Sequence, residues 1–218
     1  LFESCASGGG RFDPGMLYYA PQGWISDDTD AAERVRIQYG TSMCYPISSM
    51  GSHVSVVPNH QLNRITSLHT RANVAYFGTF GYELDLNKLT DEEIAEVKAQ
   101  IIFMKEYREL IQFGNFYRLK SPFDGNETVW MTVSEDKRKA LVFWYRERNV
   151  VNAEFTRVRL QGLDPDLIYK NEYNGTENYG DELMNLGLLT TDVTAGEPTN
   201  EDLPCTDYES RIYVLTAE

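Results

Sequence analysis

The chain has 218 residues and a formal net charge of −13 at pH 7, from 20 Lys and Arg against 33 Asp and Glu. Apolar residues make up 42% and charged residues 24%, with a mean hydropathy of −0.43 and a pI near 4.7. No apolar run approaches the roughly 18 residues that a membrane helix needs, and the acidic balance disfavours binding to nucleic acid. The length predicts one large globular domain or two small ones.

The cysteines and histidines exclude two further classes of protein. The chain has the cysteines Cys5, Cys44 and Cys205 and the histidines His53, His60 and His69. The cysteines are odd in number and far apart, so we expect no disulfide framework, and no Cys or His spacing suggests a metal site. The chain begins with Leu1 rather than Met, and we expect it to start inside a longer protein.

The first half of the chain, residues 1–113, is predicted to alternate between strands and helices. The apolar run at 16–20, bounded by Pro14-Gly15 and Pro21, predicts a buried strand. A polar cap region predicts a helix over 30–39 that ends at Gly40. Further strands are predicted at 52–57 and 79–84, with a helix at 67–77 between them.

The clearest local signal is the sequence Thr90-Asp91-Glu92-Glu93. Thr90 and Glu93 have the spacing of a capping box, and apolar residues at helical spacing follow as far as Gly114. Strands that alternate with helices in this way favour βα units around a parallel sheet.

The second half of the chain, residues 114–218, has a different pattern. Short β-type segments are separated by turn residues, and no strong helix is evident, so we predict a small antiparallel β-sandwich. The predicted strands lie at 128–133, 140–145, 156–160, 168–173 and 211–215. The polar stretch 190–204 is predicted to be a long loop.

Two segments could support chemistry. The first, residues 3–13, places the triplet Gly8-Gly9-Gly10 after a short strand end, where backbone can approach a ligand closely. The triplet does not match phosphate-binding or dinucleotide-binding patterns, and a flexible loop is an equal interpretation.

The second segment, residues 24–30, holds three carboxylates within four positions, Asp27, Asp28 and Asp30. Like charges at this spacing can hold one carboxyl protonated, as a general acid requires. Helix capping is the competing interpretation, because Ser, Asp and Thr are favoured ahead of a helix. Trp24 favours a sugar site, since an indole face stacks on the apolar face of a pyranose. His53 is interpreted as a hydrogen-bonded structural histidine rather than a base.

Several of these segments resemble the α-galactosidases of glycoside hydrolase family 36. The similar stretches are 3–5, 8–13, 22–30, 50–55, 58–61, 78–84 and 179–184, all in the same order along the chain. The resemblance implies an α/β plus all-β architecture: residues 1–113 as the C-terminal part of a (β/α)₈ TIM barrel, strands 5 to 8, and residues 114–218 as a C-terminal antiparallel β-sandwich. Active sites of such barrels lie at the C-terminal ends of the strands.

The resemblance also implies a mechanism. Retaining glycosidases use two carboxylates about 5–5.5 Å apart. Asp27 corresponds to the acid/base, while Cys5, Gly8 and Trp24 correspond to residues that touch the galactose. The family's nucleophile is an aspartate in a Lys-x-Asp motif, which we expect upstream of Leu1. No cofactor or metal is implied.

The resemblance finally implies substrates, partners and a location. Terminal α-linked galactose of oligosaccharides such as melibiose and raffinose is the implied substrate, in a cytoplasmic homo-oligomer, with a tetramer as one form. Two alternatives stay open: an α-N-acetylgalactosaminidase or galactosyl transferase of the same family, and a non-catalytic carbohydrate-binding or assembly fragment.

Overall fold

The computed structural model describes residues 2–5, 13–150, 154–190 and 207–217. The chain divides into two units, Leu1–Phe113 and Gly114–Glu218, each with its own set of contacts. The predicted glycine triplet at 8–10, Cys205 and nearly all of the predicted loop at 190–204 lie outside the described residues.

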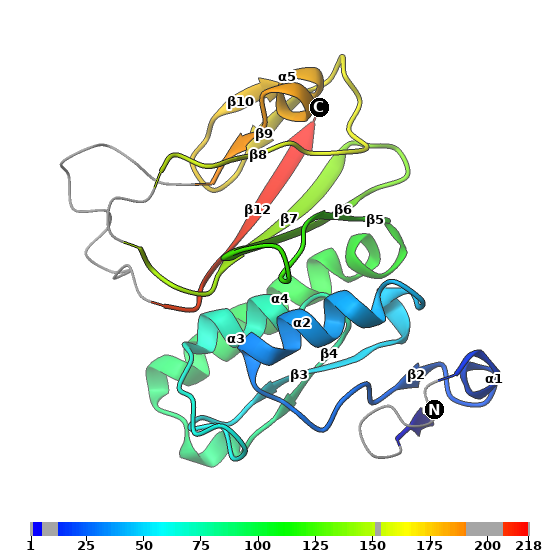
Figure 1. Ribbon diagram of the computed structural model, residues 1–218, viewed down its shortest axis with the longest axis vertical. Helices are drawn as coiled ribbons and strands as arrows, with labels where there is room; N and C mark the ends of the chain where they lie inside the picture. The colour runs from blue at the N-terminus through cyan, green and yellow to red at the C-terminus, as the bar shows by residue number, and fades with distance from the viewer. Residues whose placement is uncertain (1, 6–12, 151–153, 191–206, 218) are drawn as a thin grey trace. The chain divides into compact units, whose positions relative to one another are not determined.

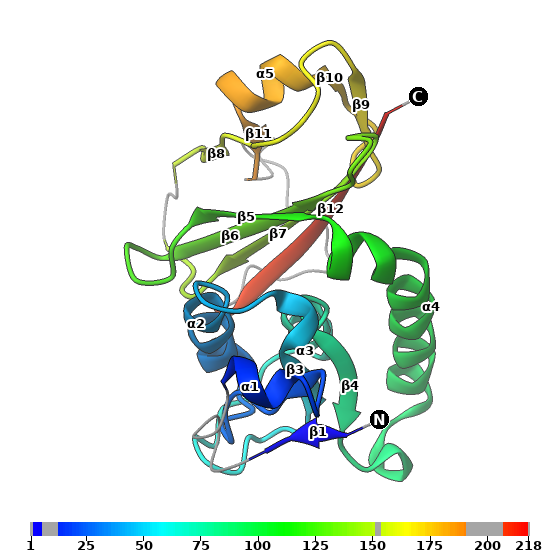
Figure 2. The same ribbon diagram turned by 90° about the vertical axis from the view of Figure 1, so that its right-hand side faces the viewer.

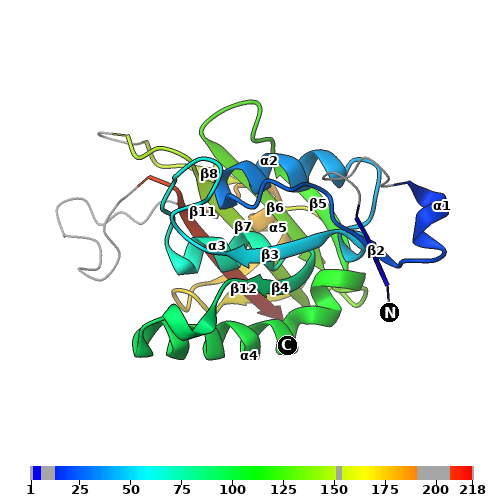
Figure 3. The ribbon, with the colours of Figure 1, turned by 90° about the horizontal axis from the view of Figure 1, so that it is seen from below.

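The described part of the first unit contains short parallel strands, β1 (Glu3–Ser4), β2 (Gln22–Gly23), β3 (Gly51–Ser55) and β4 (Thr79–Glu83). As Figures 1 and 3 show, β3 and β4 lie against α3 (Leu68–Ala75), while β1 and β2 lie at the edge beside α1 (Pro14–Leu17). β1 pairs with β2 and β3 pairs with β4, both in parallel, and a parallel bridge between Gly23 and Met50 joins the two pairs. The four strands therefore follow one another in chain order, as they do in part of a βα barrel.

The helices of the first unit fill the connections between and after these strands. They are α1 (Pro14–Leu17), α2 (Ala31–Thr41), α3 (Leu68–Ala75) and α4 (Asp91–Phe113), with short 3₁₀ turns at Ile47–Ser49 and Leu86–Lys88. Ser52 and Val54 of β3 are fully buried, and the Ser52 hydroxyl donates to the carbonyl of Ala75 in α3. In α2, Gln38 donates to the carbonyls of Val74 (3.0 Å) and Phe77 (3.2 Å). These bonds link the helices to each other and to the outer face of the sheet.

One predicted strand in this unit is wrong. Residues 16–20 are not a buried strand: Pro14–Leu17 form the helix α1, and Tyr18 and Tyr19 are exposed. The Asp13 side chain accepts from the N–H of Met16 at 3.1 Å, and Pro14 stands in the first turn, where its missing N–H costs nothing. The cap therefore outweighs the short apolar run, and the strand follows at Gln22–Gly23.

The predicted end of the helix at 30–39 is also wrong, by two residues. Gly40 lies inside α2, which continues to Thr41 because the N–H of Ser42 still donates to the carbonyl of Gln38 at 2.9 Å. The other predicted helices and strands of this unit lie within a few residues of their predicted places, while β2 was not predicted.

The second unit is built on a six-stranded antiparallel sheet (Figure 2). Its strand order is β10-β9-β12-β7-β6-β5. The strands are β5 (Asn115–Lys120), β6 (Glu127–Val133), β7 (Lys139–Arg146), β9 (Ile168–Asn171), β10 (Glu177–Tyr179) and β12 (Glu209–Ala217). The last strand in sequence, β12, lies between β7 and β9, so the C-terminal segment closes the middle of the sheet.

A second, smaller layer packs on one face of this sheet. It contains the two-stranded ribbon β8 (Arg157–Val158) with β11 (Leu188–Leu189), and the helix α5 (Gly180–Asn185). Val158, Leu160 and Leu183 of this layer pack against Val142 and Tyr213 of the sheet. β5, β10, β11 and α5 were not among the predicted elements, because none of these short segments has a clear periodic pattern.

The capping box predicted at the start of α4 is present. The N–H of Thr90 donates to the Glu93 carboxylate at 2.9 Å, and the N–H of Glu93 donates to the Thr90 hydroxyl at 3.2 Å. Together they satisfy two N–H groups that a helix start would otherwise leave unpaired.

We expect Thr90→Ala to lower the free energy of unfolding by about 1 kcal/mol, because the variant loses the hydroxyl that accepts from Glu93. Thr90→Ser retains that hydroxyl and is the matched control, with unfolding expected to stay close to that of the parent. Chemical denaturation of the complete protein measures both, and equal stability of the Ala and Ser variants would contradict the assigned cap.

Candidate active site

The carboxyl ends of β1 and β2 bring two of the predicted site residues together. Ser4 pairs with Gly23, and the N–H of Trp24 donates to the carbonyl of Ser4 at 2.7 Å. Cys5 and Trp24 are the residues that follow this pair, so they leave neighbouring strands at the same edge. The Cys5 thiol is free and exposed. Gly8, the third predicted contact, lies outside the described residues.

The indole of Trp24 packs against the imidazole of His53. Their ring centroids are 4.1 Å apart, with an interplanar angle of 33°. His53 lies on β3 opposite Gly81 of β4, on the face away from Ser52 and Val54. A Cβ at Gly81 would come within 3.3 Å of the imidazole, so the absent side chain makes room for the ring. His53 on β3 therefore packs against the indole of Trp24, which is the first residue after β2.

His53 differs from its predicted role as a hydrogen-bonded histidine. Its Nδ1 atom is buried and has no hydrogen-bond partner among the described residues. Burial, assisted by the positive charge of Arg34, lowers the pKa of His53 to about 4. The imidazole is therefore neutral at neutral pH, which suits a ring that packs against an indole.

This shift predicts a pH dependence of stability. Because the unfolded histidine binds a proton near pH 6.5 and the folded one only near pH 4, the unfolded state takes up more protons between these values. The contribution of the neutral His53 ring to the free energy of unfolding is complete above about pH 6.5 and is lost as the pH falls toward 4. His53→Phe keeps an aromatic ring beside Trp24 and removes the titration.

The measurement is the thermal unfolding temperature of the complete protein across that pH range. We expect the parent to lose more stability than His53→Phe on acidification, with the two pH profiles parallel above pH 6.5. Parallel profiles over the whole range would show that His53 is not responsible.

The three carboxylates after Trp24 have separate roles. Asp30 caps α2, accepting from the N–H groups of Ala32 (3.0 Å) and Glu33 (3.2 Å). Asp28 accepts from the N–H of Asp30 at 3.0 Å and so forms a local turn. Asp27 is exposed and makes no hydrogen bond or ion pair with any part of the chain that the structure describes. The capping interpretation is therefore correct for Asp30, and Asp27 is the carboxylate left available for chemistry.

A buried arginine that sequence reasoning missed holds this loop in place. Arg34 of α2 is 3% exposed, and its guanidinium donates to the carbonyl of Ser26 at 3.3 Å and to the carbonyl of Gly51 in β3. Burial lowers the pKa of Arg34 to about 10, with Asp28 and Glu83 acting in the opposite direction. Arg34 therefore stays charged at neutral pH and ties the Asp27 loop to the next strand. Its place in an ordinary helix pattern offered no signal for this role.

A second arginine strengthens the cap of α2. Arg64 forms ion pairs with Asp30, whose side chain is 1% exposed, and with Glu33 at 3.3 Å. Asp30 thus joins the helix start to the loop that follows β3, which makes it a structural residue.

We expect Asp27 and Asp30 to differ sharply in their effect on stability. Asp30→Ala removes a cap and a buried ion-pair partner, and should lower the free energy of unfolding by about 2 kcal/mol. Asp27→Ala removes only an exposed side chain and should change it by less than about 0.5 kcal/mol. Denaturant unfolding of the two variants makes the comparison, and a large loss for Asp27→Ala would assign it a structural role instead.

Comparison with known proteins places this arrangement in a family. The sequence profile named Melibiase matches residues 1–114, and that of the glycosyl hydrolase family 36 C-terminal domain matches residues 127–215. The chain belongs to the melibiase family. Both parts of the expected architecture, the barrel segment and the C-terminal β-domain, are confirmed.

Among curated relatives, this melibiase-family chain is 57% identical over 188 residues to α-galactosidase AgaA of Geobacillus stearothermophilus. It is 51% identical over 188 residues to α-galactosidase Mel36A of Lactobacillus acidophilus. Each match covers 86% of this chain and 26% of the relative, so the chain spans about a quarter of the length of these relatives.

Solved structures agree with the curated relatives. AgaA from Geobacillus stearothermophilus in complex with raffinose matches 100% of this chain and 29% of that structure, at 51% identity and a TM-score of 0.91. The galactosidase domain of the α-galactosidase–sucrose kinase AgaSK matches over the same shares at 46% identity and a TM-score of 0.91. None of the helices formed by the described residues is long and apolar enough to cross a membrane.

Proposed function

We propose that the protein to which this chain belongs is a retaining α-galactosidase. Its substrates would be oligosaccharides with terminal α-linked galactose, such as melibiose and raffinose. The relatives named above are α-galactosidases, and one of them is described in complex with raffinose. The observation that carries the proposal is the exposed carboxylate of Asp27, three residues after Trp24 in the loop that follows the carboxyl end of β2, in a melibiase-family chain.

In the proposed reaction, Asp27 is the acid/base. Its carboxyl group donates a proton to the glycosidic oxygen as the bond from that oxygen to the anomeric carbon breaks, and a second carboxylate attacks that carbon. The Asp27 carboxylate then takes a proton from water, whose oxygen bonds to the anomeric carbon and releases the second carboxylate. We infer that this nucleophile lies outside the chain, since the predicted Lys-x-Asp motif has no counterpart here.

The other predicted site residues would hold the sugar. The Trp24 indole, supported by His53, is suited to stack on the apolar face of galactose. Cys5 leaves the neighbouring strand at the same edge, and its small side chain would leave room for the ring. Gly8 follows Cys5 three positions later in the sequence and, by the family resemblance, is proposed to contact the sugar as well. Arg34 would act indirectly, because it holds the loop on which Asp27 stands.

Two further properties belong to the proposal. We expect a homo-oligomer in the complete protein, with a tetramer as one form, which light scattering would test. We also expect a cytoplasmic location, because Cys5 and Cys44 are free and exposed, as suits a reducing compartment.

Replacement of Asp27 tests the mechanism. In the complete protein, Asp27→Asn removes the proton donor, and turnover of raffinose should fall by about 10²–10⁴-fold. A p-nitrophenyl α-galactoside should be affected less in its first step, because its leaving group needs little protonation. Azide, which attacks without a general base, should partly restore turnover of that substrate.

Asp28→Asn is the matched control, since Asp28 forms a local turn one position away and keeps its acceptor oxygen as Asn. Unchanged raffinose turnover in Asp27→Asn would contradict the assignment of the acid/base. Release from a p-nitrophenyl α-N-acetylgalactosaminide but not from the galactoside would favour the galactosaminidase alternative. Hydrolysis by the 218-residue chain unaided would contradict an external nucleophile.

A further inference from the structure

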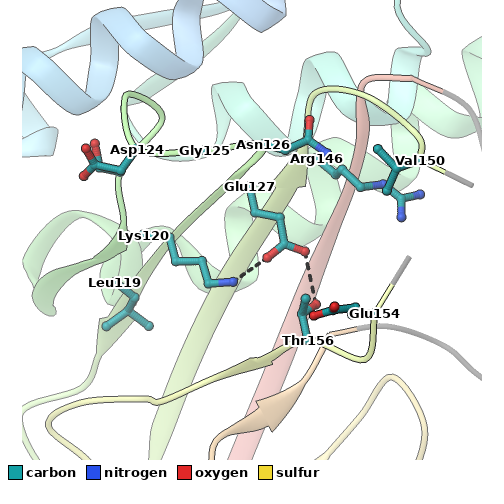
Figure 4. Close-up of a pocket in the computed structure, with 11 residues that line it drawn as sticks. Leu119, Lys120, Asp124, Gly125, Asn126, Glu127, Arg146, Val150, Glu154 and Thr156 are labelled. Atoms are coloured by element: carbon teal, nitrogen blue, oxygen red, sulfur yellow. Dashed lines mark hydrogen bonds and ion pairs between the residues drawn. The ribbon is translucent and has the colours of Figure 1, made fainter. Parts of the chain in front are cut away.

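The second unit contains a cavity with a volume of about 550 Å³ at one end of the β5, β6 and β7 strands (Figure 4). This volume lies within the range of sites that hold small molecules in proteins, roughly 300–1,000 Å³. The proposed hydrolysis does not use this cavity, because every residue assigned to that reaction lies in the first unit.

The floor of the cavity is a fixed carboxylate. One oxygen of Glu127 accepts from Lys120, and the other accepts from Trp144 Nε1 and Thr156 Oγ1, both at 3.1 Å. Figure 4 shows Lys120 and Thr156 approaching this carboxylate from opposite sides. Because three donors converge on it, Glu127 is held in one orientation, and the side chains around it are held with it.

A buried arginine forms another part of the wall. The Arg146 side chain is 9% exposed, its Nη2 is paired with Glu209, and its guanidinium lies 5.5 Å from the centre of the Trp144 ring. Its Nε atom is buried and finds no acceptor among the described residues. The Nε donor is closed off from the cavity as it is from water, so a ligand could meet only the rest of the guanidinium group.

The rim adds acceptors and apolar surface. Asp124 and Glu154 are exposed at the mouth, and Leu119 and Val150 provide aliphatic contacts. Acidic groups at the rim and the net charge of −13 disfavour an anion, while Lys120 and Arg146 disfavour a cation. The mixture of donors, acceptors and aliphatic surface suits a neutral ligand with many hydroxyl groups.

We propose that this cavity is a saccharide-binding site of the C-terminal β-domain. The hydroxyl groups of a neutral mono- or oligosaccharide would donate hydrogen bonds to Asp124 and Glu154, and would accept hydrogen bonds from Lys120 and Arg146. Few apolar contacts are available, so binding should be weak, in the millimolar range.

The test measures binding of raffinose to the complete protein while 1-deoxygalactonojirimycin, which is bound in a structure of AgaA, occupies the catalytic site. Isothermal titration and saturation-transfer NMR should then detect one further site for raffinose. If the complete protein neither hydrolyses galactosides nor binds the inhibitor, the proposed function fails. The raffinose titration is then run without inhibitor, so that the binding site in the second unit is judged separately.

Gly125→Trp is designed to fill the cavity with an indole, and the fold should tolerate it, because a Cβ at this lining residue meets no atom within 4 Å. We expect it to weaken raffinose binding by at least about tenfold. Glu135→Trp adds the same side chain in the exposed turn at the other end of the β6–β7 hairpin, and should leave binding unchanged. Both variants should retain galactoside hydrolysis.

Asp124→Ala combined with Glu154→Ala provides a second check that removes acceptors without adding bulk. Both side chains are exposed, so folding should be unaffected, and weaker raffinose binding is expected. The proposal is overturned if the parent protein shows no further raffinose site, if Gly125→Trp binds as well as Glu135→Trp, or if the double variant binds as well as the parent.

Discussion

The parallel register of β3 with β4 determines which side chains of the first unit face the predicted site. His53 pairs with Gly81, while Ser52 and Val54 turn to the opposite face and are buried beside α3. A shift of one residue would exchange the two sets, so it would place an imidazole under a helix and a valine under Trp24. The burial of Ser52 and Val54 thus holds His53, and through it the indole, in place.

The loop after β2 shows how neighbouring residues of one type acquire different functions. Asp30 completes a helix and an ion pair, and Asp28 closes a turn, so both carboxylates are committed to the backbone. Asp27 is left exposed, while Arg34 anchors the preceding carbonyl of Ser26. A proton donor needs a rigid support and an unoccupied oxygen, and this loop supplies both.

The sheet of the second unit holds a group of charged side chains that are paired with one another around Trp144. Lys120 pairs with Glu127, and Glu209 pairs with both Arg146 and Arg211. Trp144 lies between the two groups: its Nε1 donates to Glu127, and both guanidinium groups lie within 5.5 Å of its ring centre. Such a network is costly to bury unless nearly every polar group is satisfied. Its members come from β5, β6, β7 and β12, so the strand order of the sheet is what assembles it.

The sequence by itself determined the elements whose signals are local. The Thr90–Glu93 capping box, the helix at 68–75 and the strand at 79–83 depend on residues a few positions apart, and their predicted places hold. Family motifs likewise indicated Asp27 as the catalytic candidate, which stays a prediction. Only the tertiary structure decided which aspartate caps α2, that His53 packs against Trp24, and that buried Arg34 and half-buried Glu127 each bind several partners. The cap is local, but several aspartates at suitable spacing compete for it; the roles of His53, Arg34 and Glu127 depend on contacts between residues 7 to 29 positions apart, and no periodic pattern along the chain encodes such pairs.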